Sequence, residues 1–184
     1  MPRRSSAIAS RAALLVVSLV AHAASGCGGT DIPARGVIET NVGDWEFRRY
    51  QRVLDVEVWI PGNPAVAHTA SYVFRDAARR GDVARSDVVS AFVTRYEHDR
   101  DIEDAVAAFS RRLASEPGYS VEVGEVSGGR AAYIRGTGEA WVLWASEVHV
   151  VKLGGRGRDE VPGNLVGAYA EHYPSTLDDH ALAR

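Results

Sequence analysis

The spacing of apolar residues is most regular in the segment 101–115, where it predicts a helix. Apolar side chains recur there at intervals of four, three and four residues, at Ile102, Val106, Phe109 and Leu113. These intervals place them along one face of a helix, which we expect to pack on the sheet that contains Trp141 and Trp144. Asp101 suits the beginning of this helix, and Pro117 suits its end.

Four short apolar segments in the second half of the chain predict strands. They cover about 119–126, 130–135, 139–145 and 148–153. Short connections between consecutive strands are typical of an antiparallel meander. The segment 140–145 (AWVLWA) has no polar face, so we expect it at the centre of the sheet with both sides covered.

Two more strands are expected in the first half of the chain. Every second residue from Leu54 to Ile60 is apolar, which indicates a strand over 52–60. An earlier strand or extended arm, which contains Trp45, Phe47 and Tyr50, is expected to pair with it. The segment 88–96 (VVSAFVTRY) predicts another strand.

The segment between these two strands fits two different structures. The spacing of apolar residues over 64–79 predicts a helix that begins after Asn63 and ends before Gly81. The alternative is a strand over 69–75, because threonine, tyrosine, valine and phenylalanine favour strands there.

A last helix is expected over about 160–172, ending at Pro174. The elements together predict an α+β fold, in which two or three helices pack on an antiparallel sheet that includes a C-terminal four-strand meander.

The first 26 residues differ in composition from the rest of the chain. Their charged residues are all arginines, at positions 3, 4 and 11, and a run of mostly apolar residues follows over 12–24. This order is typical of a secretory signal peptide. The apolar run is too short to cross a hydrocarbon core of about 30 Å as a helix.

The leader ends in Ala24-Ser25-Gly26, directly before Cys27. This motif resembles the lipobox of bacterial lipoproteins, whose usual form is Leu-Ala/Ser-Gly/Ala-Cys, although alanine stands here in place of leucine. The resemblance implies that Cys27 receives a lipid and becomes the first residue of the mature chain. Cys27 is the only cysteine, so no disulfide can form within the chain. The alternative is an ordinary secreted protein with a free thiol after its cleavage site.

The same resemblance predicts a location and a division into regions. Gly28, in place of the aspartate that retains lipoproteins in the inner membrane, implies an outer-membrane protein that faces the periplasm if the source is Gram-negative. We expect a signal peptide over 1–26, lipidated Cys27 and a tether over 27–43, one domain over 44–174, and a flexible tail over 175–184. The flexible part of the tether, 28–36, would reach at most roughly 30 Å.

The charge of the chain argues against some partners. Without the three arginines of the leader, 18 basic residues remain against 24 acidic residues, which gives a net charge of −6. This balance argues against nucleic-acid binding, and against docking on anionic lipid by charge alone.

Candidate catalytic or metal-binding motifs are weak. The acidic segment 98–104 could hold a metal or an acid–base pair, but it lacks the spacing of a calcium loop and better suits the beginning of a helix. The histidines lack zinc-binding spacing, and we expect His149 to face solvent from its strand. Glycine-rich segments such as 154–157 match no phosphate loop, and the common serine-nucleophile motifs are absent. We therefore predict no catalytic residue, no cofactor and no metal.

Four aromatic residues remain as candidates for a ligand or partner groove: Trp59, Tyr133, Trp141 and Trp144. The alternative, which is commoner for aromatic residues in strands, is that they pack in the core. The sequence favours a membrane-anchored, non-enzymatic module that binds a protein, an envelope polymer or a small ligand. An envelope enzyme with an unrecognised active site is the second hypothesis.

Overall fold

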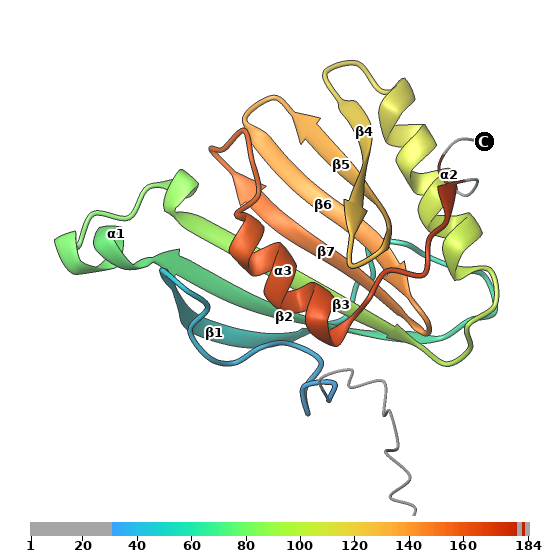
Figure 1. Cartoon of the computed structure of the whole chain (residues 1–184), viewed down its shortest axis with the longest axis horizontal. Helices are drawn as coiled ribbons and strands as arrows, with labels where there is room; N and C mark the ends of the chain where they lie inside the picture. The colour runs from blue at the N-terminus through green and yellow to red at the C-terminus, as the bar shows by residue number, and fades with distance from the viewer. Residues whose placement is uncertain (1–30, 180–181, 183–184) are drawn as a thin grey trace, which may run out of the picture.

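The computed structural model describes residues 31–179 and residue 182 of the 184-residue chain. The predicted leader, Cys27 and Gly28 therefore lie outside the described residues. The described part forms an antiparallel sheet of seven strands in the order β1-β2-β3-β7-β6-β5-β4, with helices packed on it (Figure 1). The predicted α+β class is confirmed.

The strands are β1 (Trp45–Val53), β2 (Ala65–Phe74), β3 (Val88–Tyr96), β4 (Ser120–Val126), β5 (Gly129–Gly136), β6 (Glu139–Ser146) and β7 (His149–Arg156). The helices are α1 (Arg75–Arg80), α2 (Ile102–Ser115) and α3 (Gly163–His172), with a short 3₁₀ turn, η1 (Arg85–Asp87), before β3. In this described part, no helix is long and apolar enough to cross a bilayer.

The second half of the chain follows the prediction from the sequence. The meander β4 to β7 is present, and each of its strands begins and ends within three residues of the predicted bounds. β3, α2 and α3 also match their predicted segments. β6 lies between β5 and β7, and all its residues from Val142 to Ser146 are buried, as expected for a strand covered on both sides.

The strand predicted over 52–60 is wrong, because the chain leaves the sheet after Val53. The aromatic arm that was expected to pair with this strand is β1 itself, which pairs with β2. Residues 54–64 instead form a loop in which Val58 and Ile60 are buried, whereas Leu54 is 93% exposed. The alternation of apolar residues was therefore misleading, because its members do not share one environment.

The helix predicted over 64–79 is also wrong, and the alternative strand is confirmed. β2 runs from Ala65 to Phe74 and pairs with β1 on one side and β3 on the other. Helix begins only after this strand, in the six-residue α1 (Arg75–Arg80). Pairing on both sides gives the β-branched and aromatic residues of this segment a better environment than an isolated helix would provide.

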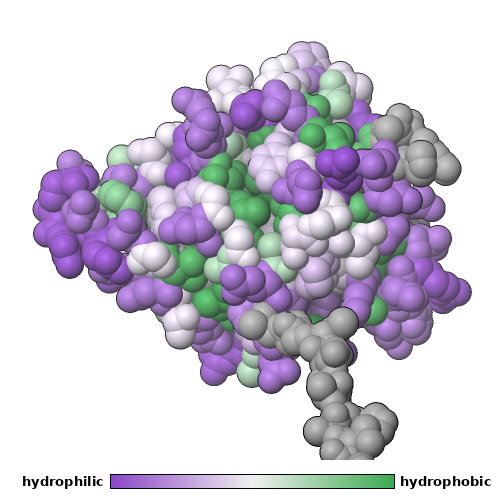
Figure 2. All heavy atoms as spheres, viewed as in Figure 1, coloured by the Kyte–Doolittle hydropathy of each residue, from purple (hydrophilic) through white to green (hydrophobic). Residues whose placement is uncertain are grey.

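Different elements cover the two faces of the sheet. On one face, here called the α3 face, Tyr169 and Tyr173 from α3 and its C-terminal end contact Tyr72 and Trp144 of the sheet. Figure 2 shows the molecule from this side, with hydrophilic side chains covering the α1 end. On the opposite face, the α2 face, α2 packs over β4 to β7 and buries Ile102 and Val106.

The placement of α2 agrees with its apolar stripe, but the two tryptophans of β6 point in opposite directions. Successive side chains of a strand alternate between the faces of a sheet. Trp144 lies on the α3 face, where its Nε1 donates a hydrogen bond to the carbonyl oxygen of Tyr173 at 2.8 Å. Trp141, three residues earlier, consequently lies on the α2 face.

Both ends of the described chain pack against the domain. Val37, in the segment assigned to the tether, is 1% exposed and belongs to the core. Leu177, in the segment assigned to the tail, is also 1% exposed, and its carbonyl oxygen accepts a hydrogen bond from the backbone of Arg130. The packed domain therefore extends beyond 44–174 at both ends.

Candidate binding surface

The four aromatic residues named as a candidate groove do not share one site. Trp144 is fully buried in the core. Trp59 lies in the loop 54–64 and is 72% exposed. Tyr133 pairs with Val142, so its side chain lies on the α3 face, where it lines a hollow of about 170 Å³ with Val161. The side chain of Trp141 lies on the opposite, α2 face, so the structure does not bring the four residues together as one groove.

A second cluster, which the spacing of residues in the sequence did not indicate, surrounds Trp141 on the α2 face. The Nζ of Lys152 lies 4.3 Å from the ring centroid of Trp141 and 6.0 Å from that of Phe92. The two rings are 6.1 Å apart between centroids. Lys152 also donates a hydrogen bond to Glu57 at 2.5 Å, across 95 residues of sequence. An ammonium group over a tryptophan ring is a favourable cation–π arrangement.

Glu139 extends this cluster along the same face. The hydroxyl of Tyr119 donates a hydrogen bond to Glu139 at 2.6 Å, and Arg156 lies 3.8 Å from its carboxylate. The Tyr119 hydrogen bond is the main reason why the pKa of Glu139 is lowered, so the carboxylate remains charged. We use the name Trp141–Lys152 surface for five residues: Glu57, Phe92, Glu139, Trp141 and Lys152.

A glycine allows Trp141 to lie close to β7. Gly154 pairs with Trp141, and a Cβ added to Gly154 would come within 2.8 Å of the Trp141 ring and 2.1 Å of the carbonyl oxygen of Ala140. The φ of Gly154 is 151°, a backbone conformation that residues with a side chain rarely adopt. The position of the Trp141 ring therefore depends on the absence of a side chain at residue 154.

Most of the Trp141–Lys152 surface is partly accessible to solvent. Phe92 and Trp141 are half-buried, and the side chains of Lys152 and Glu57 are 13% and 36% exposed. Neighbouring positions on the same face carry small polar side chains, Ser71 and Ser90. The surface thus presents aromatic groups, paired charges of both signs and small polar residues.

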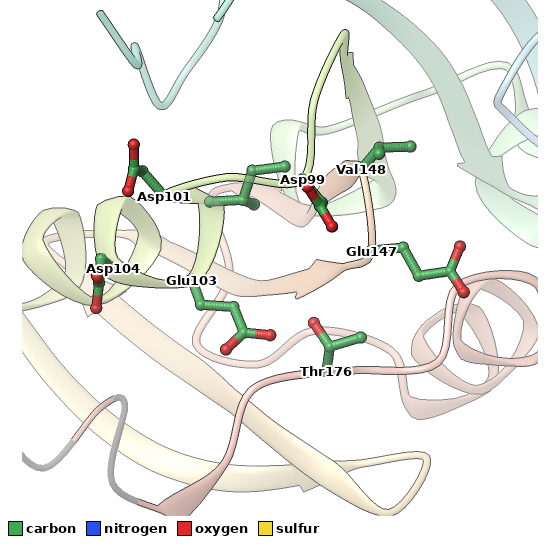
Figure 3. Close-up of a pocket in the computed structure, with 8 residues that line it drawn as sticks. Asp99, Asp101, Glu103, Asp104, Glu147, Val148 and Thr176 are labelled. Atoms are coloured by element: carbon green, nitrogen blue, oxygen red, sulfur yellow. The ribbon is translucent and has the colours of Figure 1, made fainter.

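The acidic segment 98–104 lies at the beginning of α2 and lines a hollow of about 630 Å³. Asp99 and Glu103 point toward the hollow, whereas Asp101 and Asp104 leave the helix in other directions, and Glu147 extends from the β6–β7 turn (Figure 3). Among residues 31–179 and 182, no group of three or more metal-binding side chains is placed to hold an ion. These carboxylates therefore stand as separate charges around the first turn of a helix.

The expectation that His149 faces solvent is wrong. His149 is 5% exposed on the α3 face, and its ring centroid lies 5.1 Å from that of Tyr173. Burial is the main cause that lowers its pKa, which favours a neutral ring. The valines on either side of His149 correctly predicted a strand. Which face of that strand is covered could not be predicted from them, because the covering residue, Tyr173, lies at the end of α3, later in the chain.

The chain matches no protein-family model, and comparisons with curated proteins and with solved structures find no significant match. A functional assignment must therefore come from the chemistry of the residues.

One signal in the sequence could have identified the second cluster. Lys152 is the only lysine among 21 basic residues, so its position is unusual for this chain. Its partners could not have been found from spacing, because Glu57, Phe92 and Trp141 belong to a loop and two strands that only the sheet order brings together.

Proposed function

We propose that the protein is a lipoprotein of the cell envelope, anchored through a lipid on Cys27, whose folded domain is a non-enzymatic binding module. The leader and the Ser25-Gly26-Cys27 motif support the anchor. A diacylated cysteine would hold the chain stably on a membrane, because two acyl chains bind far more tightly than one. The domain would then be free to use its surface for a partner.

The observation that supports a binding role is the Trp141–Lys152 surface. Protein interfaces are enriched in aromatic residues at their centre and have polar rims, and hot spots concentrate on such aromatic residues. Phe92 and Trp141 would form the centre, and the charged side chains of Glu57 and Lys152 would flank it.

A protein is the partner that this surface fits best. The Lys152 ammonium lies over the ring of Trp141, so that side of the ring is not free to stack on a sugar of an envelope polymer. Side chains of a protein could instead contact the ring edges and form ion pairs with the flanking charges.

The anchor is tested by replacing Cys27 in the full-length chain. Cys27→Ser should abolish incorporation of labelled fatty acid and release the protein from the membrane fraction. Ser25→Ala is the matched control, because alanine is also accepted at that position of the motif, and it should be processed normally. Unchanged membrane partitioning and mature mass for Cys27→Ser would refute the anchor.

The binding surface is tested by site-specific photo-crosslinking in intact cells. Gln51 is exposed and pairs with Thr69 on the same face, so a crosslinking residue there should give an adduct of discrete mass. The same residue at Gly167, exposed on α3, is the control and should give none. Glu57→Lys should remove the Gln51 adduct. Equal adducts at both positions, or none at Gln51, would contradict this role of the surface.

A further inference from the structure

The point at which the chain leaves the domain is fixed by three buried tyrosines. Tyr72 donates a hydrogen bond to the carbonyl oxygen of Ile38, and the Ile38 amide donates to the hydroxyl of Tyr169 at 3.1 Å. Tyr173 donates to the carbonyl oxygen of Gly36 at 2.7 Å. The segment that leads back toward Cys27 therefore begins at a defined place on the α3 face.

Residues before Gly36 also contact the domain surface. The carbonyl oxygen of Asp31 lies 2.8 Å from Nδ1 of His172, which donates to it. Ile32 lines a hollow together with Arg95 of β3 and Val148 of the β6–β7 turn. Only three residues lie between Asp31 and Cys27, so the distance from one to the other is at most about 14 Å when the chain is fully extended. A lipid on Cys27 would hold this end of the domain close to the bilayer.

Exposed apolar side chains gather at this same end of the sheet. Of the five large apolar residues that are exposed among residues 31–179 and 182, three lie here: Ile32 (49%), Leu54 (93%) and Trp59 (72%). Leu54 directly follows β1, and the loop that carries Trp59 is held by a hydrogen bond from Tyr96, the last residue of β3. Tryptophan prefers the interface between water and lipid, where its apolar ring and its N–H group are both accommodated.

Two arginines at this end are available for an anionic group. Arg52 and Arg95 line a hollow of about 580 Å³ with His68, and in the described part of the chain neither guanidinium has a carboxylate within 4.0 Å. Burial, followed by the charge of Arg52, lowers the pKa of His68. Guanidinium groups bind phosphate oxygens in a bidentate manner.

Acidic residues are also present at this end, notably Glu97 and Glu147, which line the same hollows. With these acids nearby and a mature net charge of −6, charge alone would not hold the domain on a membrane. A covalent lipid would hold the domain there without help from charge, because it gives the attached domain a high effective concentration at the membrane surface.

We propose that this end of the domain, defined by Ile32, Arg52, Leu54, Trp59 and Arg95, rests on the phospholipid surface that holds the Cys27 lipid. Leu54 and Trp59 enter the headgroup region, and Arg52 and Arg95 bind lipid phosphates. This inference rests on the proposed lipid anchor. Its consequence is a fixed orientation of the domain. The end of the sheet where β1 and β3 end and β2 and β7 begin faces the membrane, and the α1 end points away from it (Figure 1).

The test measures the depth of Trp59 in vesicles that carry the lipidated protein. Vesicles of phosphatidylethanolamine and phosphatidylglycerol are prepared with and without bromine on the acyl chains, which quenches nearby tryptophans. We expect quenching in the unmodified protein, its loss in Trp59→Phe, and its retention in the control Trp141→Phe. Quenching that persists in Trp59→Phe, or its absence from the unmodified protein, would overturn the proposal.

A pair of apolar substitutions tests the same surface without changing a tryptophan. Leu54→Asp should reduce the quenching of Trp59, because a carboxylate beside the loop opposes contact with lipid. Val83→Asp is the matched control, since Val83 is 46% exposed in the loop after α1, and it should leave the quenching unchanged. Equal quenching in the two variants would count against the proposed orientation.

Flotation with the vesicles separates failure of this inference from failure of the anchor. If unmodified protein floats, Cys27→Ser does not, and Trp59 is not quenched, the anchor stands and the orientation is wrong. If Cys27→Ser floats to the same extent as the unmodified protein, the anchor itself is wrong. The short distance from Asp31 to Cys27 would then no longer place this end of the domain at the bilayer.

Discussion

The hydroxyl oxygens of Tyr72 and Tyr169 lie 2.8 Å apart in the core and connect β2 to α3. Because the Tyr72 hydrogen is donated to the carbonyl oxygen of Ile38, Tyr169 is the donor between the two hydroxyls. Tyr169 also accepts a hydrogen bond from the amide of Ile38. The pair therefore satisfies both backbone groups of Ile38 and attaches the N-terminal segment to the sheet.

The first prediction concerns this pair. Tyr169→Phe should lower the free energy of unfolding by about 1–3 kcal/mol, because it leaves the buried Ile38 amide without a partner and removes the hydrogen bond that the Tyr72 hydroxyl accepts. Tyr119→Phe, which removes a hydroxyl that bonds Glu139 at the surface, should cost clearly less, because water can replace the lost partner. Urea denaturation of the two variants measures the difference, and equal costs would contradict the role given to Tyr169.

The second prediction concerns alkaline pH. Burial raises the pKa of Tyr72 from 10.0 to about 12, and it raises the pKa values of Tyr96, Tyr169 and Tyr173 as well. In the unfolded chain these groups ionise near pH 10, whereas in the folded chain they stay neutral. Their contribution to stability is therefore complete below pH 10 and declines as the pH rises toward 12.

One such tyrosine reduces stability by at most about 1.4 kcal/mol per pH unit above its unfolded pKa. Urea denaturation at about pH 9 and about pH 11 measures the decline, which should be smaller in Tyr169→Phe. A free energy of unfolding that is the same at both values would show that these hydroxyls do not stay neutral in the folded chain.

The third prediction concerns the N-terminal segment. A chain that begins at Asp44 should be less stable than one that begins at Asp31, because it lacks Val37 and both backbone groups of Ile38. Burial of one valine is worth about 1.5–3 kcal/mol, and each lost buried partner adds about 1–3 kcal/mol. Thermal unfolding of the two chains checks this, and indistinguishable transitions would show that residues 31–43 are only a tether.

The fourth prediction concerns Gly154. Gly154→Ala should destabilise the protein by more than about 2 kcal/mol, because the new Cβ would meet the carbonyl oxygen of Ala140 and the strand would have to shift. Gly163→Ala is the control, since no atom lies within 4 Å of a Cβ at that position, and its effect should stay within about 0.5 kcal/mol. A tolerated Gly154→Ala would show that Trp141 does not need its close approach to β7.

The fifth prediction concerns the acidic residues at the beginning of α2. Asp104→Ala should change the free energy of unfolding by less than about 1 kcal/mol, because an exposed carboxylate in the first turn interacts only weakly with the helix dipole. A chelator should leave the melting temperature of the unmodified protein unchanged. A melting temperature that falls with chelator, and no longer responds in Asp104→Ala, would identify a metal site instead.

The sequence by itself determined those elements whose stabilising contacts are close in the chain. The meander β4 to β7 depends on turns of two residues, and α2 depends on an apolar stripe that repeats along one face of the helix. The residues that form these elements are neighbours along the chain, so their spacing was sufficient to predict them. The lipid anchor on Cys27 remains a prediction from its motif.

Only the tertiary structure decided where residues with distant partners would lie. The apolar alternation over 54–60 looked like a strand, but Val58 is held by Tyr96, and Glu57 reaches Lys152 in β7. His149 is buried because Tyr173, from the end of α3, packs against it. The candidate surface around Trp141 likewise depends on the order of strands β3, β7 and β6, which brings together side chains up to 95 residues apart. Local spacing contains no information on such pairs, because sheet order and helix placement determine which distant side chains become neighbours.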